Sequence, residues 1–142
     1  MTATPITLPD ALDRHLSTNN TTASLADYLD RGAKLVTPEA VAALRRQQNS
    51  LRTKIASLAE SERLRNRIAL LASAFEEACT SAQAGNRAHQ EIAFALLYFL
   101  KGADRIPDSV PEVGLLDDAM LVQLVLQRHA AALRAHCLRR GL

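Results

Sequence analysis

The sequence predicts an all-α fold, a compact bundle of five to seven helices. Leucine and alanine, both strong helix formers, are abundant in a chain whose hydrophobic content is 48%. Glycine and proline number five each, and most of them stand where a helix would end. Apolar residues also recur at steps of three and four, the spacing of one helix face. A length of 142 residues suits a single domain with its own core.

Residues 1–36 are expected to form short N-terminal helices and a linker. Pro9 fits the first turn of a helix that runs to about Ser17, and a polar linker follows over residues 18–22. Ser24 can cap a second short helix, which Gly32 is expected to end.

Residues 37–84 are expected to form amphipathic helices. Thr37, Pro38 and Glu39 combine a capping hydroxyl, a proline at the first position and an acid in the first turn. Two apolar stripes follow, and the second is one residue out of phase with the first. One straight helix would present two different faces and would be too long for a compact domain. We therefore expect a break near residues 60–62.

The first stripe is a candidate association seam with two apolar positions per heptad. Its members are Val41, Leu44, Leu51, Ile55 and Leu58, with Gln48 in the position that the pattern leaves polar. Such a seam packs either on a neighbouring helix of the same chain or on a second copy, and a polar seam residue sets register. Because the short N-terminal helices are poor cover for it, we expect a protein partner or a weak homodimer here.

Residues 86–142 are expected to form a helical hairpin. The segment 87–101 is apolar all round from Ile92 to Leu100, which is typical of a central, buried helix. Gly102 stops it, and a loop with Pro107 follows. The last helix is expected to begin at Asp117 or Asp118, run to about residue 139 and pack against the first.

Four aspartates of this region are candidate ligands. Carboxylate oxygens suit Mg²⁺ or Ca²⁺, but the spacing of Asp104, Asp108, Asp117 and Asp118 does not match an EF-hand loop. Caps and bonds to loop amides explain the four residues better, with Asp108 and Asp117 as the caps. We therefore predict no metal and no cofactor, and keep a metal- or small-ligand-binding site, conceivably hydrolytic, as the alternative.

The same region resembles the signature of the YkvA-like family, a bacterial domain of unknown function. That signature is an apolar helix, an Asp-x-Ile-Pro-Asp turn, and an Asp-Asp pair that opens a second apolar helix. Gly102 stands where many relatives carry proline. The resemblance implies a helical hairpin and no agreed activity, and many relatives look membrane-associated. The residues that carry it are Asp104, Ile106, Pro107, Asp108, Pro111, Gly114, Asp117 and Asp118.

No catalytic residue is predicted. There is no Gly-rich phosphate loop and no nucleophile elbow. Cys79 and Cys137 lack metal-type spacing and are expected to be reduced, packed thiols. The histidines form no ligand set, although two of them lie seven apart and would share a helix face, so we expect surface histidines. They are His15, His89, His129 and His136.

The charge is unevenly spread along a chain whose net charge is only +2. A basic cluster occupies residues 45–67, and the acidic stretch 76–118 is its expected partner within the chain. The cluster lacks the interleaved aromatic residues of a nucleic-acid site, so there is no strong case for nucleic acid, and peripheral contact with an anionic membrane is an alternative. The longest apolar run is far short of the about 20 residues of a membrane span, and the N-terminal residues do not resemble a signal peptide. A cytoplasmic protein is expected.

Taken together, these patterns favour a non-catalytic interaction or scaffold module. It would bind protein through the association seam or the 102–118 loop. The alternatives are a metal- or ligand-binding domain built on the aspartates, and a peripheral binder of anionic membrane or nucleic acid that uses the basic helix.

Overall fold

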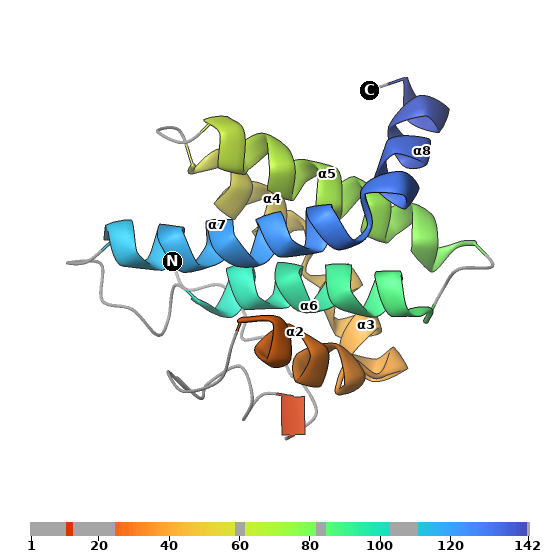
Figure 1. Cartoon of the computed structure of the whole chain (residues 1–142), viewed down its shortest axis with the longest axis horizontal. Helices are drawn as coiled ribbons and strands as arrows, with labels where there is room; N and C mark the ends of the chain where they lie inside the picture. The colour runs from red at the N-terminus through yellow and green to blue at the C-terminus, as the bar shows by residue number, and fades with distance from the viewer. Residues whose placement is uncertain (1–10, 13–24, 59–61, 82–84, 103–110, 142) are drawn as a thin grey trace.

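The computed structural model describes residues 11–12, 25–58, 62–81, 85–102 and 111–141 (Figure 1). This part of the chain contains helices and no strand, which confirms the all-α prediction. Ala11 and Leu12 are helical, and the further helices are α2 (Leu25–Lys34), α3 (Pro38–Arg46), α4 (Gln48–Ala56), α5 (Glu62–Cys79), α6 (Arg87–Gly102), α7 (Pro111–Arg128) and α8 (Ala130–Arg140).

Helix α6 is the centre of the bundle. It contacts α2, α3, α4, α5 and α7, and every side chain from Glu91 to Leu97 is buried. An apolar surface that runs all round a helix has to be covered on every side, and the five neighbours provide that cover (Figure 1). The expected packing of the two apolar helices against each other is confirmed for α6 and α7.

Lys54 of α4 closes the carboxyl end of α6. Its Nζ donates to the carbonyl oxygens of Phe99 and Leu100 at 2.5 and 2.9 Å and lies 5.0 Å from the centroid of the Phe99 ring. The last carbonyls of a helix have no partner within the helix, and a cation there is favoured by the helix dipole. A residue that the sequence assigns to a surface basic cluster therefore joins α4 to α6.

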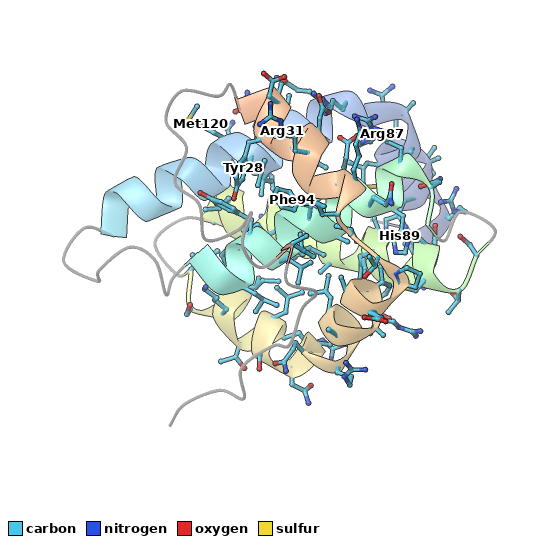
Figure 2. All side chains as sticks on the ribbon, turned by 90° about the horizontal axis from the view of Figure 1, so that it is seen from below. Tyr28, Arg31, Arg87, His89, Phe94 and Met120 are labelled. Carbon is cyan, nitrogen blue, oxygen red and sulfur yellow. The ribbon has the colours of Figure 1, made fainter. Side chains whose placement is uncertain are left out.

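Gly32 does not end its helix, contrary to the sequence prediction. It lies inside α2, where α2 crosses α6 so closely that an added Cβ would come within 2.2 Å of Phe94 Cε1. Tyr28, one turn earlier, packs edge-on against Phe94 with the ring centroids 5.4 Å apart (Figure 2). Glycine is used here because only a residue without a side chain admits the aromatic ring.

The predicted break between the two apolar stripes is confirmed, because α4 ends at Ala56 and α5 begins at Glu62. A second break, which the pattern does not predict, separates α3 from α4 at Gln47. There the side chain of Gln48 donates to the carbonyl oxygen of Leu44 at 3.3 Å. Gln48 therefore supports the end of α3 and does not act as a polar seam residue.

The association seam is a packing face within the chain. Leu44 and Leu51 are fully buried in the single chain, and Ile55 is 9% exposed. Val41 and Leu58 are partly buried against the same core. Of the two expected alternatives, the stripe takes the first, since α4 packs on α5 and α6. Leu44 and Leu51 are therefore not exposed for contact with a second copy of the chain, as the expected homodimer would require.

Helix α7 begins earlier than predicted. Its first residue is Pro111, so Asp117 and Asp118 lie inside the helix and neither caps it. Proline at the first helical position costs no hydrogen bond and presets the backbone. The helix forms despite Gly114 in its interior, which costs about 1 kcal/mol relative to alanine.

The predicted last helix is two helices. The backbone leaves the helical region at His129, with φ −119° and ψ 30°, so α7 ends at Arg128 and α8 begins at Ala130. Helix α8 then leaves the direction of α7 and rises beside the end of α5 (Figure 1). His129 and His136 therefore lie at the junction and on α8, and do not share the face of one helix.

Substituting Gly32 with alanine should destabilise the fold by about 1–3 kcal/mol, the usual cost of overpacking. The added Cβ would force the fully buried ring of Phe94 to shift, and we expect this cost to exceed the gain of alanine over glycine in a helix, about 1 kcal/mol. Chemical denaturation measures it. The double variant Gly32→Ala/Phe94→Leu is the control, because a smaller side chain removes the clash. Equal costs of the glycine substitution in both backgrounds would contradict a Gly32–Phe94 contact.

Candidate functional site

The residues of the predicted signature are placed only in part by the structure. Asp104, Ile106, Pro107 and Asp108 lie outside the described residues. Pro111, Gly114, Asp117 and Asp118 lie in the first half of α7. The expected structural role of the four aspartates and the alternative of a metal or ligand site on them therefore both stay untested predictions. Among the described residues, no group of three His, Cys, Asp or Glu side chains is arranged to hold a metal ion.

A buried glutamate joins three helices at one end of the bundle. Glu91 of α6 is 1% exposed. Its Oε2 accepts from Arg87 Nε at 2.7 Å, and its Oε1 accepts from Arg128 Nη1 at 3.2 Å and lies 3.1 Å from His129 Nε2. Asp30 of α2 accepts from the same two arginines, at 2.6 and 2.7 Å. We call these five residues the Glu91 cluster.

The Glu91 cluster is an ionic network in which both carboxylate oxygens of Glu91 accept hydrogen bonds. Burial raises the pKa of Glu91, but the bonds from Arg87, His129 and Arg128 outweigh it and hold the pKa below its usual value. The hydrogen bond from Arg128 likewise lowers the pKa of Asp30. A carboxylate that stays ionised and fully bonded is suited to holding α2, α6 and α7 together, and is not suited to accepting a proton from a substrate.

A second cluster joins α8 to α5. Glu77 of α5 accepts from Arg139 through Oε1, and from Arg140 Nε through Oε2 at 3.2 Å. His136 of α8 is 2% exposed. Its Nδ1 lies 3.2 Å from Glu77 Oε1, and its Nε2 lies 2.9 Å from Ser73 Oγ. The hydrogen bond from Arg139 and then the proximity of His136 lower the pKa of Glu77 to about 2. We call these five residues the Glu77 cluster.

The order Ser73, His136, Glu77 is that of a nucleophile, its base and the acid that orients the base. Two features argue against catalysis. Ser73 lies inside α5, where the neighbouring backbone N–H groups are committed to the helix and cannot form an oxyanion hole. Ser73 is also absent from the lining of the adjacent cavity. The arrangement therefore fixes the position of α8.

Cys79 and His89 form a pair that does not activate the thiol. His89 is 2% exposed and tilts against the ring of Phe75, with centroids 5.1 Å apart. Its Nδ1 accepts from the backbone N–H of Gly85 at 2.8 Å, so its Nε2 carries the proton and faces Cys79 Sγ at 3.5 Å. Burial lowers the pKa of His89 and raises the pKa of Cys79. A neutral imidazole that donates to the sulfur cannot deprotonate it.

The prediction of surface histidines is wrong for His89 and His136, since both are buried. His129 is mostly buried as well, with 16% of its side chain exposed, and His15 lies outside the described residues. The prediction of unpaired cysteines agrees with the structure, in which Cys79 and Cys137 are free thiols. His89 bonds to Cys79 and His136 bonds to Ser73. The sequence carries no spacing pattern that would have predicted these two contacts.

A cavity of about 320 Å³ lies between α5, the first turn of α6 and α8. His89, at its α6 wall, is labelled in Figure 2. Its walls combine small apolar side chains with members of the Glu77 cluster. The lining residues are Ala74, Glu77, Ala78, Ser81, Asn86, Ala88, His89, Ile92, Ala132, Leu133, His136 and Arg139.

The pairing of the basic cluster with the acidic stretch stays a prediction, because most acidic side chains of that stretch lie outside those that the structure describes. Arg45, Arg46 and Arg52 are exposed. In the described part of the chain, Glu77 and Glu91 are bonded by Arg87 and by arginines near the C-terminal end. None of the described helices is both long and apolar enough to cross a membrane.

The model of one protein family matches residues 91–124, and the family is described as a protein of unknown function (DUF1232). The matched segment is similar to an uncharacterised domain family and runs from the buried Glu91 through most of α7. It covers less than half of the chain. No curated protein and no solved structure matches the chain significantly.

Sequence reasoning missed the residues that form both clusters. The one local signal was the pair Arg87 and Glu91, which are four apart on one helix and therefore neighbours on its surface. In the second cluster, Glu77 lies about 60 residues before its partners His136 and Arg139, and it meets them only because α8 packs against α5. No spacing rule connects them, so only the direction of α8 brings them together.

Substituting Glu91 with glutamine should cost about 3 kcal/mol, the low end for breaking a buried ion pair. The cost comes from leaving Arg128 and His129 without their charged partner. Urea denaturation of the two proteins measures it. Asp30→Asn is the matched control, because Asp30 has a third of its side chain exposed and such pairs contribute about 1 kcal/mol or less. If the Asp30 variant lost as much stability as the Glu91 variant, burial of Glu91 would not be decisive.

The Glu77 cluster should make stability depend on pH in the acid range. The pKa of Glu77 is lowered from 4.5 to about 2 in the folded protein. Its contribution is therefore complete above pH 4.5 and is lost as the pH falls through about 2. The difference in Tm between the protein and Glu77→Gln should be constant near neutral pH, shrink below pH 4.5 and vanish near pH 2. The exposed neutral variant Thr80→Val should show no such trend, and a flat Glu77→Gln difference would contradict the assignment.

Proposed function

We propose that the protein is a non-catalytic interaction module of the YkvA-like kind, and that α8 presents its binding face. The described ionisable and nucleophilic groups support this proposal. Glu91 and Glu77 hold helices together, the Cys79 thiol faces a donating imidazole, and Ser73 lacks the donors that acyl transfer needs.

The observation that carries the binding face is the exposure of Leu138, 79%. Helix α8 buries Leu133 and His136 against the bundle. The opposite side carries Ala131, Arg134 and Leu138, which are exposed and share one face at steps of three and four. We call these three residues the α8 outer face.

The partner that this face suits is an acidic amphipathic segment of another protein. No acidic residue follows Asp118 in the chain, and Arg134 shares the α8 outer face with Leu138. An apolar residue flanked by arginine matches a helix or strand that carries one apolar anchor and acidic neighbours. We propose this face in place of the association seam, because Leu44 and Leu51 of the seam are fully buried within the chain. The aspartate loop and the basic helix are kept as alternatives, and no contact of the described residues favours either.

A photo-crosslinking amino acid at position 138 should attach a partner protein in cells that express the chain. The same group at exposed Asn66 of α5 should not attach it, because that position lies outside the α8 outer face. The attached protein is identified by mass spectrometry and then purified for binding measurements.

The purified partner should bind Leu138→Glu or Arg134→Glu at least about tenfold more weakly, a loss of about 1.4 kcal/mol. The Tm should hardly change, since exposed substitutions usually shift stability by less than about 0.5 kcal/mol. Attachment only to a second copy of the chain would replace the acidic partner by a homodimer. Identical attachment at positions 66 and 138 would refute the α8 outer face.

A further inference from the structure

We propose that the cavity beneath α8 is a binding site for a small organic anion, a carboxylate or phosphate group with a short apolar body. This inference does not depend on the proposed function, which concerns the opposite side of α8. Its volume, about 320 Å³, lies at the small end of the range of ligand pockets, about 300–1,000 Å³.

The charge around the cavity favours an anion. Glu77 is the carboxylate in its wall, and two guanidinium groups, those of Arg139 and Arg140, bond to it. Arg140 bonds Glu77 without lining the cavity, and together with Arg139 it gives this group of three side chains one positive charge in excess. Arg139 also lines the cavity itself, where it is placed to form the charge-assisted bonds that carboxylates and phosphates receive from arginine.

The first turn of α6 adds donors on the opposite wall. Asn86 and Ala88 line the cavity there. Asn86 Oδ1 accepts a hydrogen bond from the backbone N–H of His89 at 2.8 Å. The backbone N–H groups of the residues before His89 in this first turn have no acceptor within the helix. The amino end of the helix dipole also favours negative charge. Two walls from distant parts of the chain therefore present positive potential to one space.

A buried polar atom in the wall points to the same ligand. His136 lines the cavity and is 2% exposed. Its Nε2 is engaged by Ser73. Its Nδ1 has no hydrogen bond of acceptable geometry, although Glu77 Oε1 lies 3.2 Å away. When Ser73 Oγ donates to Nε2, Nδ1 carries the proton; a buried donor without an aligned acceptor is costly, and an anion in the cavity would supply an acceptor.

The rest of the lining sets the size and character of the ligand body. Alanines from all three helices, with Ile92 and Leu133, form the apolar walls. Small side chains leave room for a short alkyl or ring body, and not for a long chain. An anionic head against Arg139 and α6, with an apolar body against the alanines, uses every part of the lining.

The test is a titration of the full chain with sodium hexanoate, hexanol and sodium phosphate at equal ionic strength, followed by backbone amide NMR. Hexanoate should shift the amides of α8 and the first turn of α6 saturably. Hexanol and phosphate should each bind at least about tenfold more weakly, because each lacks one of the two features. If hexanol or phosphate binds as well as hexanoate, or hexanoate shifts do not saturate, the proposal is wrong.

Two neighbouring alanines of α8 provide a matched pair of variants. Ala132 lines the cavity and Ala131 does not, and both are exposed. Ala132→Leu should fill the space and weaken hexanoate binding at least about tenfold, whereas Ala131→Leu should leave it unchanged. Arg139→Gln should weaken it to a similar degree, with the Tm of each variant checked. Equal effects of the two leucine variants, or no effect of Arg139→Gln, would overturn the proposal.

Discussion

The rest of the structure depends on the enclosure of α6. Its side chains from Glu91 to Leu97 are all buried, so neighbours must cover it on every side, and five helices do so. This constraint explains features that otherwise look unrelated. Gly32 lets α2 approach Phe94, Lys54 bonds the last carbonyls of α6, and the first amphipathic stripe turns inward because α6 needs cover on that side as well.

The two ionic clusters then fix the angles between helices, which apolar packing alone does not determine. Apolar contacts are non-directional, so they permit several angles between helices. The Glu91 cluster ties α2, α6 and α7 at one end, and the Glu77 cluster sets the direction of α8 against α5. Buried ion pairs add little net stability, and their better-attested role is to select one arrangement. The same reasoning accounts for Glu91 and Glu77, whose carboxylates accept hydrogen bonds from other helices.

The position of α8 has two consequences for binding. One side of this helix forms a wall of a cavity in which Arg139 and the carboxylate of Glu77 lie together. The other side exposes Leu138 next to arginine. Both features arise because the chain leaves the helical backbone at His129, which turns α8 away from the line of α7. A straight helix from residue 111 to 140 would place neither the cavity nor the outer face where they are.

The sequence by itself determined the helical class, the central place of α6 and the break before α5, because each depends on local propensity or on apolar periodicity. The tertiary structure decided the rest. The seam residues Leu44 and Leu51 are apolar in either environment, and only the enclosure of α6 turned them inward. Asp117 is a plausible cap in isolation, but α7 already begins at Pro111. Glu77 and His136 carry no spacing signal, since their contact requires the turn at His129. Contacts between residues far apart in the chain depend on helix directions, which periodicity does not encode.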